Sequence, residues 1–194
     1  MVNIMRKILV FLLSISLTAC FKDSSQEKLN NSYDKYYQVL NSILSNVNYQ
    51  TSSEYYDINF EYTKDQDGNY IYYVTIDDVN VAMNNIVVAL DDVSNLENEK
   101  IIIPSKGIFE DITFNMIPNH ANIENNYYEG IILSGVKVPN NTNDKSFDIR
   151  IYVEWTNDDY SKTYKEYLRI LIDDSKVDVK LETTNQENEN EPNE

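Results

Sequence analysis

Residues 147–155 read Phe-Asp-Ile-Arg-Ile-Tyr-Val-Glu-Trp, with an apolar side chain at every second position. Because side chains alternate between the two faces of a β-strand, this stretch predicts a strand with one buried face. Trp155, the only tryptophan of the chain, ends the apolar series and is therefore expected in the core. The stretch indicates a mainly β fold.

Two further segments near the C-terminus have the same character. Residues 164–172 and 177–181 are rich in apolar side chains, and turn-forming residues at 157–159 and 173–175 separate the three segments. We expect these three strands to form an antiparallel meander with one buried face.

A hairpin is predicted earlier in the chain. Residues 58–62 and 70–76 alternate between apolar and polar side chains. Residues 64–69 connect them, and Asp67-Gly68 supplies the left-handed backbone conformations that a tight hairpin needs.

Residues 79–93 leave two alternatives open. Asn84-Asn85 is typical of a turn before a strand at 86–90, but residues 79–90 also fit a helix. After this segment, Ile101-Ile102-Ile103 ends at Pro104, which predicts a short edge strand. Two apolar segments then follow and are expected to be central strands, at residues 107–117 and 127–138.

Together these segments give about eight or nine short strands with turn residues roughly every ten positions. We therefore expect residues 53–182 to form one antiparallel immunoglobulin-like β-sandwich. Residues 183–194 carry almost no apolar side chain and are expected to be a disordered acidic tail.

One amphipathic helix is predicted before the strands, at residues 25–48. Ser24 and Glu27 have the spacing of a capping box. The apolar stripe either packs on the following domain or lies on a membrane or a partner. Packing is favoured, because membrane-surface helices usually carry many Lys and Arg residues. The stripe consists of Leu29, Tyr33, Tyr36, Tyr37, Leu40, Ile43, Leu44 and Val47.

The N-terminal residues 1–19 have the pattern of a secretory signal peptide. Arg6 and Lys7 precede an apolar run at 8–17, and this run is too short to cross a bilayer, which takes about 20 apolar residues.

The four residues that end this segment, Leu17, Thr18, Ala19 and Cys20, resemble the lipobox of bacterial lipoproteins. The resemblance implies cleavage before Cys20 and its linkage to diacylglycerol, with acyl chains such as palmitate. It also implies a location at the extracytoplasmic face of the cell membrane, with residues 20–24 as a spacer. The alternatives are an ordinary signal peptide with a chance cysteine, or a buried core thiol. With Cys20 lipidated, no cysteine remains for a disulfide, a metal site or a nucleophile.

The charge balance limits the possible partners. The chain has a formal net charge of −16. Cleavage would remove 19 residues and two positive charges, leaving 175 residues with a charge of −18. Such a charge repels phosphate backbones, which excludes nucleic acid as an expected partner. Basic proteins, cationic peptides and divalent cations stay open as partners.

Residues that could carry chemistry are few. His120 is the only histidine, which leaves little for a catalytic triad or a zinc site, and we predict no catalytic residue and no metal ligand. Acidic pairs could gather to bind Ca²⁺, although aspartates are also typical of turns. The pairs are Asp77-Asp78, Asp91-Asp92, Glu110-Asp111, Asp158-Asp159 and Asp173-Asp174.

The 16 tyrosines are the remaining candidates for a binding surface. Exposed tyrosines supply rigid, amphipathic contact area for a protein or a glycan. Tyr72, Tyr127 and Tyr128 are the predicted ligand-binding residues, although most strand tyrosines are expected to be half-buried. The sequence therefore favours a membrane-anchored binding or interaction module. A cell-surface hydrolase using carboxylates and a structural envelope protein are the alternatives.

Overall fold

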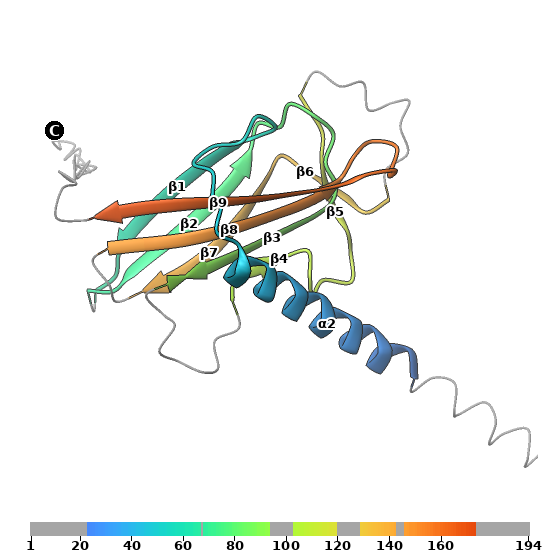
Figure 1. The fold of residues 1–194 in the computed structure, drawn as a ribbon, viewed down its shortest axis with the longest axis horizontal. Coiled ribbons are helices and arrows are strands. Elements are labelled where there is room, and N and C mark those ends of the chain that lie inside the picture. Colours follow the sequence, from blue (N-terminus) through green and yellow to red (C-terminus); the bar gives the residue numbers. More distant parts are fainter. Residues whose placement is uncertain (1–22, 67, 94–102, 120–128, 143–145, 174–194) are drawn as a thin grey trace, which may run out of the picture.

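The computed structural model describes residues 23–66, 68–93, 103–119, 129–142 and 146–173. The predicted signal segment, Cys20, the strand predicted at 177–181 and the predicted tail lie outside these residues. The protein is mainly β, with one helix and strands that pair largely antiparallel (Figure 1). Its elements are α2 (Asp23–Ser45), β1 (Asp57–Lys64), β2 (Tyr70–Asp77), β3 (Asn84–Asp92), β4 (Ser105–Lys106), β5 (Phe114–Met116), β6 (Ile131–Leu133), β7 (Gly135–Thr142), β8 (Ser146–Thr156) and β9 (Thr163–Asp173).

Two sheets pack face to face and enclose the larger core. One has the order β1-β2-β7 and the other β4-β3-β8-β9. Phe147 on β8 contacts rings from the opposite sheet, with centroids 5.6 Å from Phe60 and 5.3 Å from Tyr70. Aromatic contacts of this kind fill the space between the sheets.

The predicted hairpin is confirmed. β1 and β2 pair antiparallel from Asp57 opposite Asp77 to Lys64 opposite Tyr70. Gly68 has a φ of 89°, the left-handed conformation that the connection requires. The hairpin of β8 and β9 is also confirmed, with an antiparallel register that runs from Ser146 opposite Asp173 to Thr156 opposite Thr163.

Strand β8 is buried on both faces, which corrects the expectation of one buried face. Ile151, Val153 and Trp155 face the core between the sheets. Tyr152 and Glu154 point the other way, yet they are only 1% and 9% exposed. The reason is that α2 lies on the outer face of this sheet.

Helix α2 begins at Asp23 and ends at Ser45, slightly earlier at both ends than predicted. The backbone of Ser24 therefore belongs to the helix, and Val47 is outside it with 86% exposure. The predicted packing on the domain is confirmed for the central part, which forms a second core with β3 and β8. That core consists of Tyr36, Val39, Ile43, Val87, Ala89, Ile103, Ile108 and Tyr152. No helix within the described residues has the length and hydropathy needed to cross a membrane.

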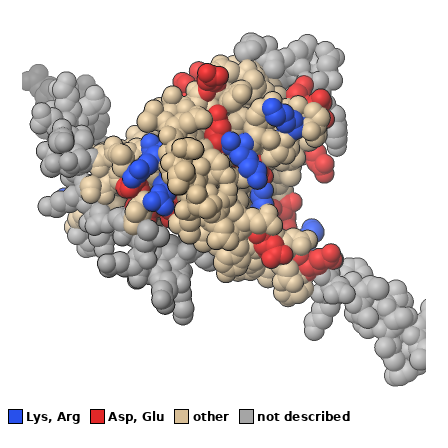
Figure 2. All heavy atoms as spheres, viewed as in Figure 1, with Lys and Arg blue, Asp and Glu red and all other residues tan. Residues whose placement is uncertain are grey.

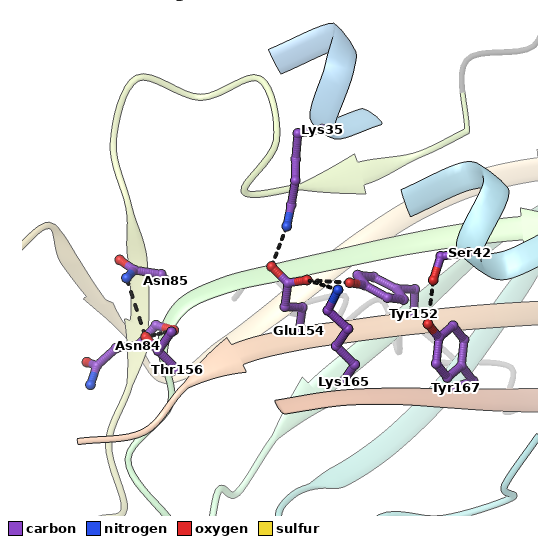
Figure 3. A network of polar contacts seen from close by, with 9 residues as sticks. All are labelled: Lys35, Ser42, Asn84, Asn85, Tyr152, Glu154, Thr156, Lys165 and Tyr167. Carbon is purple, nitrogen blue, oxygen red and sulfur yellow. Dashed lines mark hydrogen bonds and ion pairs between the residues drawn. The ribbon is translucent and has the colours of Figure 1, made fainter. Parts of the chain in front are cut away.

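Polar contacts fasten α2 to the same sheet (Figure 3). Glu154 accepts hydrogen bonds from Lys35 of α2 and from the Tyr152 hydroxyl, and Lys165 Nζ lies 3.4 Å from Glu154 Oε2. Burial raises the pKa of Glu154, but the hydrogen bonds and positive charges outweigh this and hold it below its ordinary value. A second contact joins Ser42 of α2 to the hydroxyl of Tyr167.

Residues 79–93 contain a strand, which resolves the earlier alternative. The turn expected at Asn84-Asn85 is wrong, because both residues belong to β3. The register of β3 against β8 shifts between Asn84 and Val87, and Asn85 has a φ of 52°. Asparagine tolerates this conformation well, so the pair marks a β-bulge instead of a turn.

The segment between β3 and β7 differs most from expectation. A short edge strand, β4, follows Pro104, whereas Ile101 and Ile102 of the predicted strand lie outside the described residues. Strands β5 and β6 pair parallel in a separate small sheet, and β7 is an edge strand, so none of the three is central. Gly107 explains the close packing after β4, since its φ is 87° and a Cβ there would stand 2.1 Å from the Ile86 carbonyl oxygen.

The segment between α2 and β1 lies along the outer edge of β9. The Gln50 N–H donates to the Tyr167 carbonyl, and the Arg169 N–H donates to the Gln50 carbonyl, both at 2.9 Å. These bonds cover part of an edge whose backbone groups would otherwise be free to pair with another chain.

Replacing Glu154 by Gln tests the polar fastening of α2. Glu154→Gln keeps the side-chain volume but removes the negative charge between Lys35 and Lys165. We expect the free energy of unfolding at pH 7 to fall by about 2 kcal/mol in urea denaturation. Because the pKa of Glu154 is lowered in the folded state, this difference should shrink as the pH falls below about 4.

Asp91→Asn is the matched control, because it also replaces a buried carboxylate by its amide, but at a site with the opposite pKa shift. Burial raises the pKa of Asp91 despite the nearby Arg150. Its charged form therefore weakens the fold at neutral pH, and a neutral replacement should leave stability unchanged or increase it. Equal losses of stability in the two variants at pH 7 would contradict this account.

Candidate functional site

A pocket opens at the end of the two packed sheets where β8 runs into β9. Its volume is about 380 Å³, which lies within the usual range for small-ligand sites. Its aromatic lining comes from Tyr55, Trp155 and Tyr164. The other walls are Val81 and Ala82 from the β2–β3 connection, and Asn157, Asp158 and Asp159 from the β8–β9 loop.

The aromatic side chains form one contiguous group. The rings of Trp155 and Tyr164 stack with centroids 5.2 Å apart and an interplanar angle of 8°. Tyr55 contacts both, with its centroid 5.3 Å from Trp155 and 5.8 Å from Tyr164. Trp155 itself is only 1% exposed. The tryptophan thus belongs to the core, as predicted, and also forms the floor of the pocket.

The β8–β9 loop is held by its own hydrogen bonds. The Asn157 N–H donates to the Lys162 carbonyl at 3.0 Å, and the Lys162 N–H donates to Asn157 Oδ1 at 2.9 Å. The Ser161 N–H donates to Asp159 Oδ1 at 3.0 Å. Tyr160 has a φ of 59°, which closes the turn. The acidic side of the pocket is therefore a turn whose conformation is held by hydrogen bonds.

The opposite wall is tied to the segment before β1. The Asn80 N–H donates to the Tyr55 carbonyl at 2.7 Å, and the Tyr55 N–H donates to Ser53 Oγ at 3.0 Å. These bonds bring residues 53–55 beside the β2–β3 connection, although the two segments are distant in sequence. Tyr55 is positioned by them against the rings of Trp155 and Tyr164.

The pocket combines aromatic rings with negative charge. Hydrogen bonds from Ser161 lower the pKa of Asp159, so this carboxylate is ionised at neutral pH. Lys162 Nζ lies 4.2 Å from the ring centroid of Tyr164, a cation–π contact. Rings and carboxylates of this kind together suit a cationic group more than an anionic one.

A larger and more polar groove of about 670 Å³ adjoins the pocket through Tyr55. It is lined by residues 49–55 together with Glu166 of β9. The Tyr56 ring is 2% exposed and packs against Trp155 with centroids 5.9 Å apart. Burial, together with the nearby carboxylate of Glu166, raises the pKa of the Tyr56 hydroxyl.

Of the three predicted ligand-binding tyrosines, the structure describes Tyr72, which does not line this pocket. Tyr72 is 0% exposed and lies between the sheets, which corrects its assignment to an exposed tyrosine surface. Its hydroxyl donates to Asp92 at 3.2 Å and accepts from Asn140 Nδ2 at 2.6 Å, so its contacts are internal. Tyr127 and Tyr128 lie outside the described residues, as does His120.

The acidic pairs do not gather into a metal site in the part of the chain that the structure describes, where no group of three or more His, Cys, Asp and Glu side chains could hold an ion. Asp91 and Asp92 show the physical reason. Neighbouring side chains on a strand point to opposite faces. Asp92 therefore accepts from Tyr72 in the core, whereas Asp91 pairs with Arg150 at 3.5 Å on the outer side.

Sequence reasoning missed the pocket because its residues are far apart in the chain. Tyr55 and Tyr164 stood among many tyrosines, and Trp155 was expected only in the core. The available signal was the order of residues at 155–159, where a tryptophan at a strand end is followed by a polar and acidic turn.

Comparison with known proteins identifies no relative of this chain. The chain matches no known protein family, no curated protein and no solved structure.

Proposed function

We propose that this protein is a lipid-anchored, extracytoplasmic binding module that holds its ligand in the pocket formed by Tyr55, Trp155, Tyr164 and the β8–β9 loop. The observation that carries the proposal is the pocket itself, in which an aromatic ring from residue 55 meets the rings and carboxylates of residues 155–164. The anchor part rests on the lipobox resemblance of Leu17 to Cys20.

A basic side chain of a protein or peptide partner is the ligand that this chemistry fits best. The chain carries a net charge of −16, which attracts cationic partners over a distance. Within the pocket, the ring of Tyr55 offers a cation–π contact, and Asp158 and Asp159 offer charge. A glycan would use the rings but would gain little from the two carboxylates.

The immunoglobulin-like character of the sandwich also belongs to this proposal, and the strand order supports it. The strands can be given the letters used for immunoglobulin domains. The sheet β1-β2-β7 then becomes A-B-E, and the sheet β4-β3-β8-β9 becomes C′-C-F-G. These neighbours occur in immunoglobulin-like domains. Such domains commonly bind at the loops that join strands at the ends of the sheets, which is where the pocket lies.

The hydrolase alternative gains no support from the pocket. A glycosidase places two carboxylates on opposite sides of the bond that it cleaves. Asp158 and Asp159 are instead neighbours on one loop. A purely structural role would predict that no ligand binds this pocket.

Replacing Cys20 by Ser tests the anchor. If Cys20 carries the lipid, Cys20→Ser should move the protein from the membrane fraction to the soluble fraction and abolish incorporation of labelled palmitate. The unchanged chain, processed in the same cells, is the control. Retention of the variant in the membrane fraction would contradict the anchor.

Titration of Trp155 fluorescence tests the pocket, because the only tryptophan of the chain lines it. We expect peptides with Lys or Arg to change the emission and neutral analogues to have no effect. Asp158→Asn should weaken peptide binding about fivefold, as expected for the loss of one partly exposed charge, and added salt should weaken binding further.

Tyr160→Ala is the matched control for this titration. Tyr160 belongs to the same loop and is 43% exposed, but it does not line the pocket. Its replacement should leave the affinity unchanged. A response to neutral oligosaccharides instead of basic peptides would replace the proposed ligand class, and no response to either would favour the structural role.

A further inference from the structure

Part of the apolar stripe of α2 stays outside both cores. Leu29, Tyr33, Tyr37 and Leu44 are 46%, 41%, 56% and 45% exposed. Their spacings of four, four and seven residues place them along one side of the helix. This side lies next to the row that packs on the sheet, so it faces sideways from the domain. In addition, residues 25–31 are all exposed, because the N-terminal part of α2 extends beyond the sheet (Figure 1).

A loop of the β domain widens this exposed surface. The Phe109 ring contacts Tyr33 with centroids 5.5 Å apart and Tyr36 with centroids 5.7 Å apart, yet Phe109 remains 39% exposed. Ile112, in the same loop, is 49% exposed. Together these side chains form a surface that we name the apolar flank, defined by Leu29, Tyr33, Tyr37, Leu44, Phe109 and Ile112.

The helix part of the apolar flank has mostly uncharged neighbours. Helical spacing places Gln26, Asn30 and Asn41 beside it, and Gln26 donates a hydrogen bond to Asn30. Asp34, three residues before Tyr37, also lies beside it, whereas Glu27, Lys28 and Lys35 fall on its other sides. Figure 2 shows that uncharged atoms cover most of this view of the molecule, while charged side chains stand in separate small groups.

The short distance in sequence between Cys20 and α2 indicates what lies close to the apolar flank. Only residues 21 and 22 separate Cys20 from Asp23, the first residue of α2. A fully extended chain spans at most about 3.5 Å per residue, so the start of α2 lies within about 10 Å of Cys20. If Cys20 carries the lipid, the helix must begin at the membrane surface.

We propose that the apolar flank lies in the headgroup region of the membrane and fixes the orientation of the domain there. The inference rests on the proposed anchor at Cys20. Tyrosine side chains suit this region, because the ring is apolar and the hydroxyl reaches water. The acyl chains supply the affinity, which explains how the flank can act without the many Lys and Arg residues of unanchored surface helices.

Depth measurements on the lipidated full-length protein test this inference. The thiol of Cys20 is blocked when lipidated, so a cysteine introduced elsewhere is the only site that takes a thiol-reactive fluorophore. Labels at Tyr37→Cys and Leu44→Cys report on the flank. Labels at Asn31→Cys and Gln38→Cys, which are exposed on the opposite side of α2, are the matched controls. The vesicles are phosphatidylcholine, with and without phosphatidylglycerol, and carry quencher-labelled lipids.

The flank labels should shift their emission to the blue and lose fluorescence to the lipid quenchers, while the control labels should do neither. The effect should be no stronger with phosphatidylglycerol, because the flank has no Lys or Arg and the net negative charge of the chain is repelled by anionic lipid. Equal responses at all four positions on vesicle-bound protein would overturn the inference.

A blue shift at the flank labels in Cys20→Ser protein without vesicles would also overturn it, since a second copy would then cover the flank. Failure of the lipidated protein to bind vesicles at all would instead contradict the anchor, so the two proposals fail in distinguishable ways.

Discussion

The structure depends on the burial of strand β8 on both of its faces. One face joins the core between the sheets through Ile151, Val153 and Trp155, and the other carries Tyr152 and Glu154. A buried carboxylate is costly unless it is paired. Lys35 of α2 and Lys165 of β9 supply that pairing, and Tyr36, Val39 and Ile43 pack α2 on the same side of the sheet. Helix α2 is therefore a third layer of the domain.

This layering positions both candidate surfaces. The C-terminal end of β8 delivers Trp155 to the pocket, and the hydrogen-bonded turn that follows sets Asp158 and Asp159 beside it. The same packing of α2 leaves the apolar flank exposed on the side of the helix. Because the core holds α2 at its centre, an anchor at Cys20 would lie only three positions before an element that is fixed to the domain.

Sequence periodicity predicted the strands whose inner face is regular, namely β1, β2, β8 and β9. It could not reveal the second buried face of β8, because Tyr152 and Glu154 look like ordinary solvent-facing residues until a distant helix covers them. The segments predicted as strands at 107–117 and 127–138 contain β5 and β6, but their short length and parallel pairing could not be predicted, since they are set by tertiary contacts. Tyr72 is a further example. Its strand was predicted correctly, but the sequence did not reveal that its side chain points into the core. The pocket needed the proximity of Tyr55, Val81 and Trp155, which no local pattern contains.

Native-state hydrogen exchange tests most directly whether α2 is an integral layer of the domain. Amides that open only with global unfolding share one free energy of exchange. The account predicts that the amides of residues 36–43 in α2 and those of β8 exchange with this same free energy. Exchange of residues 36–43 through a separate opening of much lower free energy, while β8 stays protected, would contradict it and make α2 an appended arm.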